Sequence, residues 1–178
     1  ETASFFGIHN WFYRDTKELS GGQKQLLNIA SAMVCSPEVL LLDEPARGLD
    51  PVAAADLLAN IGRLNRELGT TVIIVEQRLG DVMPLADSVL YMEAGEVRAL
   101  GTPQEVGAEL VSSGNPLFSG FPAPMRVWAA LGGGGVCPMD TGEGRNWLSS
   151  YMEENGRGKI PPDEVIAFSG RPALPAKD

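Results

Sequence analysis

The chain has 178 residues, a length typical of one domain of ordinary size, and a formal net charge of −9. An acidic chain of this kind disfavours nucleic-acid binding through a basic surface. No apolar run approaches the roughly eighteen residues that span a bilayer, so we expect no transmembrane helix. Its two cysteines, Cys35 and Cys137, lack metal-ligand spacing and are typical of reduced thiols in a cytoplasmic protein.

Aromatic side chains are concentrated in the first seventeen residues. Their irregular spacing predicts two short helices, broken near Gly7 or Asn10, and not one long amphipathic helix. The aromatic cluster fits a small satellite core or a docking surface equally well. Because the chain starts at Glu1 without a methionine, we expect it to be part of a longer polypeptide.

The middle of the chain predicts an α/β fold. In chain order, the predicted elements are a helix from Ser20 to Cys35, a strand at 39–42, a helix from Asp50 to Gly69 and a strand at 70–75. Ser20 and Asp50 are favourable N-caps, and Gly69 is a favourable helix stop. The unbroken apolar run 39–42 is typical of a parallel strand that is covered on both faces. A strand, a helix and a second strand in this order predict a right-handed parallel crossover.

A change of composition follows a predicted hairpin (88–92 and 97–100) and a helix that runs from Thr102 to about Val111. Residues 114–178 contain 8 of the 13 prolines and 11 of the 21 glycines. We therefore predict a domain over residues 1–111 and a Pro/Gly-rich linker over residues 112–178. The linker is expected to hold one short helix, from about Glu143 to Glu154.

Two segments carry residues suited to anion and metal chemistry. The sequence Ser20-Gly21-Gly22 opens a helix, whose first N–H groups and positive dipole end favour an anion such as a phosphate. Asp43 and Glu44 follow a buried strand, at the carboxyl end where open α/β sheets place their ligands. Two adjacent carboxylates there are costly unless a cation or a polar site satisfies them.

Three segments in this order resemble the signature motif, the Walker B strand and the D-loop of ABC-type ATPases: Leu19–Gln25, Val39–Pro45 and Gly48–Pro51. The resemblance covers roughly residues 1–110 and implies a RecA-like P-loop nucleotide-binding domain. The phosphate loop GxxxxGK[ST] does not occur in the chain, so we expect a partial domain that lacks the Walker A strand, loop and helix. The details look most like energy-coupling-factor ATPases for vitamin or metal uptake, particularly those with two ATPase domains fused in one chain.

The resemblance implies a role for each motif residue. The residues that would contact ATP held by a partner domain are Ser20, Gly21, Gly22 and Gln23, and the D-loop would consist of Gly48, Leu49 and Asp50. Asp43 would bind magnesium through water, and Glu44 would polarise the attacking water. Gln77 stands where the family has a switch histidine. Two departures accompany these matches. Gln77 can donate a hydrogen bond but carries no positive charge. Ala46-Arg47 replaces a hydroxyl and a small residue, with no evident role.

The implied function is ATP hydrolysis that powers import of a vitamin or metal ion, with ATP and Mg²⁺ as cofactors. The implied partners are a second ABC ATPase domain and a transmembrane transporter subunit, at the cytoplasmic face of the membrane, with no nucleic acid. The fragment alone is expected to be inactive. Two alternatives stay open: a soluble ABC ATPase of DNA repair or translation, and a non-catalytic half that supports a partner's ATP site.

Overall fold

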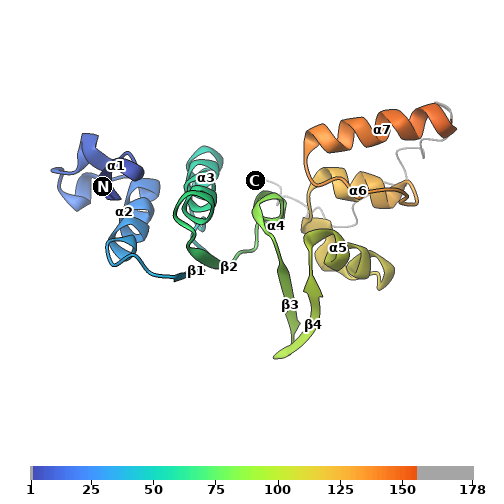
Figure 1. Cartoon of the computed structure of the whole chain (residues 1–178), viewed down its shortest axis with the longest axis horizontal. Helices are drawn as coiled ribbons and strands as arrows, with labels where there is room; N and C mark the ends of the chain where they lie inside the picture. The colour runs from blue at the N-terminus through green and yellow to red at the C-terminus, as the bar shows by residue number, and fades with distance from the viewer. Residues whose placement is uncertain (1, 156–178) are drawn as a thin grey trace, which may run out of the picture. The chain divides into compact units, whose positions relative to one another are not determined.

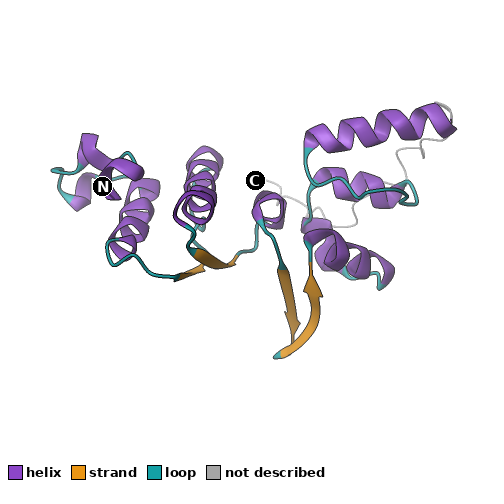
Figure 2. Ribbon diagram, in the orientation of Figure 1, coloured by secondary structure: helices purple, strands orange, loops and turns teal. Residues whose placement is uncertain are grey.

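The computed structural model describes residues 2–155 (Figure 1). The chain divides into two compact units, the first ending at Pro122 and the second beginning at Ala123. Helices and short strands alternate in the first unit, as expected for an α/β fold, and the described part of the second unit is helical (Figure 2). None of the helices between residues 2 and 155 combines the length and the hydrophobicity of a membrane span.

The aromatic N-terminal segment forms the two short helices that its spacing predicts. Helix α1 (Thr2–Phe5) and the 3₁₀ helix η1 (Ile8–Trp11) are separated by Gly7, whose φ of 65° is readily adopted by glycine. Phe6 and Ile8 are buried in the main core, whereas Phe12 and Tyr13 are exposed. The segment is therefore part of the main core and not a satellite. A further 3₁₀ helix, η2 (Thr16–Glu18), leads to the next element.

Local capping explains the next helices. Helix α2 (Gly21–Met33) begins at Ser20, whose hydroxyl accepts from Gln23 N while the Gln23 side chain accepts from Ser20 N. It ends two residues earlier than its apolar pattern predicts. Helix α3 (Pro51–Leu68) begins at Asp50, whose carboxylate accepts from two backbone N–H groups, and ends at Gly69 in the left-handed conformation. These caps are the ones that the sequence predicts.

The two central strands are parallel, as predicted. Strand β1 (Val39–Asp43) pairs with β2 (Thr71–Val75), and the register places Leu40 opposite Val72 and Asp43 opposite Val75. Because strand side chains alternate between faces, the register fixes which residues share a face of the sheet. The inward set, Leu40, Leu42, Val72 and Ile74, packs with the main core.

The other face of this sheet is open in the described part of the chain. Val39, Leu41, Ile73 and Val75 are each more than half exposed, with Leu41 at 71%. Within residues 2–155, strand 39–42 is therefore covered on one face only, and not on both as its apolar pattern predicts. Within residues 2–155, the elements that pack on the sheet lie on one side only, which gives β1 the alternating burial of a half-covered strand.

The core lies between the inward face of the sheet and helices α2 and α3. Its α3 members recur at helical spacing: Leu57, Leu58, Ile61 and Leu64. Leu64 is 0% exposed, and burying a leucine side chain contributes about 1.5–3 kcal/mol to the hydrophobic stabilisation. At the edge of this core, Arg63 lies over the Phe5 ring at 4.5 Å and also pairs with Glu67.

The first unit ends in a hairpin and a helix. Helix α4 (Leu79–Val82) and the 3₁₀ helix η3 (Met83–Leu85) follow β2 and lead into β3 (Val89–Glu93) and β4 (Glu96–Gly101). The strands are antiparallel, as predicted, and their turn places Ala94 and Gly95 at positive φ. The predicted capping box opens α5 (Pro103–Ser112), and η4 (Pro116–Gly120) follows it.

Residues 112–155 contain more helix than the sequence predicts. Helix α7 (Thr141–Asn155) matches the expected helix at 143–154, but η4 and helix α6 (Ala123–Ala130) lie where only linker is expected. For α6 the physical reason is tertiary: Trp128 on α6 and Trp147 on α7 both donate their indole N–H to the Gly134 carbonyl, at 3.0 and 2.9 Å. The four glycines 132–135 adopt positive φ, so the loop can present that carbonyl to both helices.

Cys137 gives a test of this packing. Burial, with a smaller contribution from nearby Glu143, raises the pKa of its thiol to about 11, while Cys35 is exposed. Only thiolates react with iodoacetamide, so at pH 8.5 we expect Cys137 to react about 100-fold more slowly than it does in urea. Cys35 should react at nearly the same rate in both conditions. Equal rates for the two thiols in the folded chain would mean that residues 123–155 are open.

Candidate functional site

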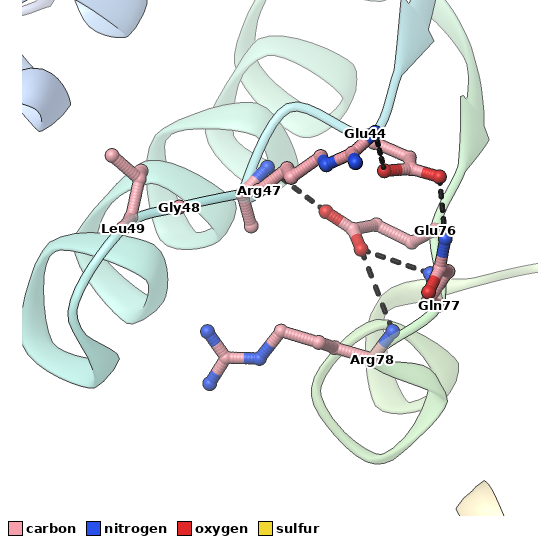
Figure 3. Close-up of a pocket in the computed structure, with 8 residues that line it drawn as sticks. Glu44, Arg47, Gly48, Leu49, Glu76, Gln77 and Arg78 are labelled. Atoms are coloured by element: carbon pink, nitrogen blue, oxygen red, sulfur yellow. Dashed lines mark hydrogen bonds and ion pairs between the residues drawn. The ribbon is translucent and has the colours of Figure 1, made fainter.

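The parallel pairing of β1 and β2 brings two predicted catalytic residues into contact. Glu44 directly follows β1, and Gln77 lies two residues beyond β2. The Gln77 side-chain amide donates to Glu44 Oε1 at 2.6 Å across 33 residues of sequence (Figure 3). An uncharged donor therefore meets one oxygen of the predicted water-polarising carboxylate.

The backbone at Glu44 is held in an uncommon conformation. Its φ of 43° lies in the left-handed region, which costs a non-glycine residue roughly 1–2 kcal/mol. The Glu44 N–H donates to the Val75 carbonyl at 2.8 Å, which extends the ladder between the two strands. Strained backbone of this kind is concentrated at functional sites. At this position, the strain turns the chain out of the strand and into the loop that precedes α3.

Arg47 has a partner that sequence reasoning did not find. Its guanidinium lies 3.1 Å from Glu44 Oε2, so both oxygens of the Glu44 carboxylate are engaged. The Arg47 side chain is 80% exposed, and an exposed ion pair contributes at most about 1 kcal/mol to stability. The pair can therefore open at little cost. The i,i+3 spacing of an acid and a base was the only signal in the sequence.

Glu76 is a second residue that sequence reasoning did not select. Its Oε1 accepts from Ala46 N at 2.9 Å, and its Oε2 accepts from Gln77 N at 3.0 Å and Arg78 N at 3.4 Å. One carboxylate thus joins the loop after β1 to the segment after β2. The neighbouring Arg78 guanidinium pairs with Asp81 at 3.0 Å.

These residues surround a hollow of about 270 Å³ at the carboxyl ends of the two strands. Its lining consists of Glu44, Ala46, Arg47, Gly48, Leu49, Glu76, Gln77 and Arg78. Open α/β sheets bind their ligands at this end of the strands. Of the predicted D-loop residues, Gly48 and Leu49 line the hollow, while Asp50 caps α3. Gly48 has a φ of 74°, which favours glycine at this turn.

The predicted signature residues do not line this hollow, but Gly21 lies next to Leu49, which does. The capping interaction of Ser20 with Gln23 starts α2, and the first-turn N–H groups of Gly21 and Gly22 have no acceptor within the helix. A methyl group on Gly21 would lie 3.4 Å from Leu49 Cδ2. On Gly22 it would lie 3.1 Å from Ala53 Cβ, so this glycine permits close packing of α2 against α3.

Asp43 is exposed at the last position of β1, beside Glu44. Within residues 2–155, no cluster of three or more His, Cys, Asp or Glu side chains could hold a metal ion. Magnesium at nucleotide sites is often held by only one or two carboxylates, together with waters and phosphates. A single exposed aspartate next to Glu44 fits that kind of site and not an all-protein metal cage.

Comparison with known proteins identifies a family for the first part of the chain. Residues 3–47 match the ABC transporter family. A putative ABC transporter ATP-binding protein of Bacillus thuringiensis subsp. konkukian is 40% identical over 132 residues, covering 73% of this chain and 24% of the relative. The methionine import ATP-binding protein MetN of Leifsonia xyli subsp. xyli is 41% identical, covering 60% of this chain and 31% of that relative.

The fold has a solved counterpart of the same family. CbiO1 of Clostridium perfringens, described as part of the ABC transporter complex cbiONQ, is 35% identical with a TM-score of 0.57. The similarity covers 64% of this chain and 46% of CbiO1. The chain therefore contains part of an ABC transporter ATP-binding domain. It spans about a quarter to a third of the length of the Bacillus and Leifsonia relatives.

The contact between Gly22 and Ala53 predicts a specific defect. Gly22→Ala should lower the free energy of unfolding by about 1–2 kcal/mol, because overpacking costs more than the helix propensity that alanine contributes. Combining it with Ala53→Gly should remove the clash and recover part of the loss. Urea unfolding curves of the two single variants and the double variant measure the coupling.

Gly62→Ala is the matched control. A methyl group at Gly62 would meet only the flexible end of the Arg66 side chain, so this change in α3 should raise the stability by about 0.5–1 kcal/mol. Equal effects of the Gly22 and Gly62 changes would show that α2 and α3 do not pack closely at Gly22.

Proposed function

We propose that this chain belongs to an ATP-binding and ATP-hydrolysing subunit that powers ABC-type import of a small nutrient such as a vitamin or metal ion. The observation that carries the proposal is the contact between Glu44 and Gln77 at the carboxyl ends of two parallel strands. It joins a carboxylate suited to polarising water with a neutral donor, beside the loop that leads into α3.

The named relatives support import as the direction of transport. MetN is named as a methionine import protein, and CbiO1 is described as part of an ABC transporter complex. Similarity to CbiO1 favours an energy-coupling-factor-like ATPase. The greater length of these relatives supports a longer parent protein, in which other residues supply the Walker A strand, loop and helix. We propose a parent with two fused ATPase domains, in which residues 1–111 end one domain and residues 112–178 belong to the connection.

Each motif residue has a proposed role in that parent. Asp43 would hold magnesium through water, and Glu44 would polarise the attacking water beside Gln77. Bound Mg²⁺-ATP would supply the phosphoryl group that is transferred to this water. The D-loop residues Gly48, Leu49 and Asp50 would border the same site. The helix start at Ser20, Gly21, Gly22 and Gln23 would face the ATP of the second ATPase domain.

The proposed partners are that second domain and a transmembrane transporter subunit, with the ATPase placed peripherally at the cytoplasmic face of the membrane. The net charge of −9 argues against a nucleic-acid partner. It thus disfavours a role in DNA repair or translation.

ATP turnover by the complete polypeptide tests this function. Glu44→Gln should lower kcat by about 10²–10⁴-fold, the usual contribution of a general base, without a matching change in the KM for ATP. Glu38→Gln, an exposed carboxylate at the other end of β1, is the matched control and should leave the rate unchanged. The 178-residue chain alone should not hydrolyse ATP. If it does, and Glu44→Gln abolishes that turnover, the partial-domain proposal is wrong.

Gln77 gives a second test, of asymmetry between two ATP sites. Loss of one positioned donor typically costs about 10²–10³ in rate, and the glutamine amide retains part of that contribution. The site that contains Glu44 and Gln77 should therefore be the slower one, and Gln77→His should raise its turnover about tenfold. Single-turnover kinetics of the complete polypeptide measures each site. An unchanged rate in Gln77→His would show that the absence of a positive charge at this position does not slow the site.

A further inference from the structure

We infer that Glu76 is a positioning residue that sets the geometry between Glu44 and Gln77. Its carboxylate is the one side chain among residues 2–155 that bonds to backbone on both sides of the hollow, on the loop after β1 and on the segment after β2. The catalytic consequence rests on the proposed function. The structural connection itself does not.

The first oxygen of Glu76 bonds to a buried backbone group that is distant in sequence. Ala46 is 1% exposed, and its N–H donates to Glu76 Oε1 across 30 residues of sequence. A buried backbone N–H without an acceptor costs about 1–3 kcal/mol, so the carboxylate holds Ala46 in place. Ala46 lies two residues after Glu44, whose left-handed backbone leaves little freedom between them.

The second oxygen of Glu76 bonds to the segment that follows β2. Oε2 accepts from Gln77 N and Arg78 N, which orients the peptide units that carry the Gln77 side chain toward Glu44 (Figure 3). Hydrogen bonds to an ionised acceptor are about twice as strong as those between neutral groups. One carboxylate thus joins the backbone of Gln77 to that of Ala46, two residues after Glu44, and so limits the relative position of the two residues in the 2.6 Å contact.

This arrangement predicts what the loss of Glu76 does. Glu76 does not bond to the Glu44 side chain, so its removal leaves the reacting groups present but no longer fixed relative to each other. Misplacement by about 1 Å can cost about 10²-fold in rate. Substrate affinity should change little, because the shift affects the alignment of Glu44 and Gln77.

The experiment compares Glu76→Ala and Glu76→Gln in the complete polypeptide, with Glu93→Ala as the control. Glu93 also ends a strand, but its carboxylate contacts the side chains of Tyr91 and Arg98. In Glu76→Ala, kcat should fall about 10²-fold while the KM for ATP stays within about twofold. Glu76→Gln keeps one carbonyl acceptor and should lose about tenfold.

Two further readouts separate positioning from loss of structure. Hydrogen exchange, followed by mass spectrometry on peptides covering residues 44–48 and 76–79, should accelerate about tenfold in both Glu76 variants and not in Glu93→Ala. When Gln77→Ala is added to Glu76→Gln, kcat should fall by less than the product of the two single effects, because both act on one contact.

Wild-type kcat in Glu76→Ala, or unchanged exchange in both segments, would overturn the inference. If Glu76→Ala does not fold, the isosteric Glu76→Gln decides it by the same measurements. If the wild-type polypeptide has no ATPase activity, the proposed function fails, while the exchange data still decide whether Glu76 holds the two segments together.

Discussion

The register between β1 and β2 is the constraint on which the site depends. Asp43 lies opposite Val75, and the Glu44 N–H continues the ladder to the Val75 carbonyl. A slip of one residue would turn the inward side chains, such as Leu40, to the open face, so core packing enforces this register. Hydrophobic packing of the two strands therefore places Glu44 and Gln77 near each other, at the same end of the sheet.

The loop between β1 and α3 combines strain with strong local anchoring. Glu44 and Gly48 both have positive φ, and the buried Ala46 lies between them. At one end Asp50 caps α3, and in the middle Glu76 accepts from Ala46 N. An ordered loop of this kind can keep a carboxylate in a costly conformation, because the anchors on either side oppose relaxation. The exposed pair between Arg47 and Glu44 adds little to that anchoring.

The sequence predicts what depends on local rules. Ser20 and Asp50 as caps, Gly69 as a stop and the parallel strands all follow from short patterns, and the structure confirms them. Helix α6 was missed because its loop is fixed by indole donors 6 and 13 residues from the Gly134 carbonyl, which glycine content alone does not reveal. The contact between Glu76 and Ala46 could not be predicted, because it depends on the strand register. The close packing at Gly22 could not be predicted either, because it depends on the position of Ala53 in the fold.

Each of the two small sheets exposes a row of apolar side chains. Leu90, Met92, Val97 and Leu100 are more than half exposed, and paired positions of the hairpin place them together, Leu90 with Leu100 and Met92 with Val97. The parallel sheet shows its own apolar row, which includes Leu41 and Ile73. Contiguous apolar surface is uncommon on soluble monomers and generally marks a contact face. The similarity to CbiO1 covers 46% of that protein, and in the proposed parent further residues would complete both sheets. In that proposal the same residues would also bring the phosphate-binding groups to the carboxyl ends of β1 and β2, so the residues that complete the core would also complete the ATP site.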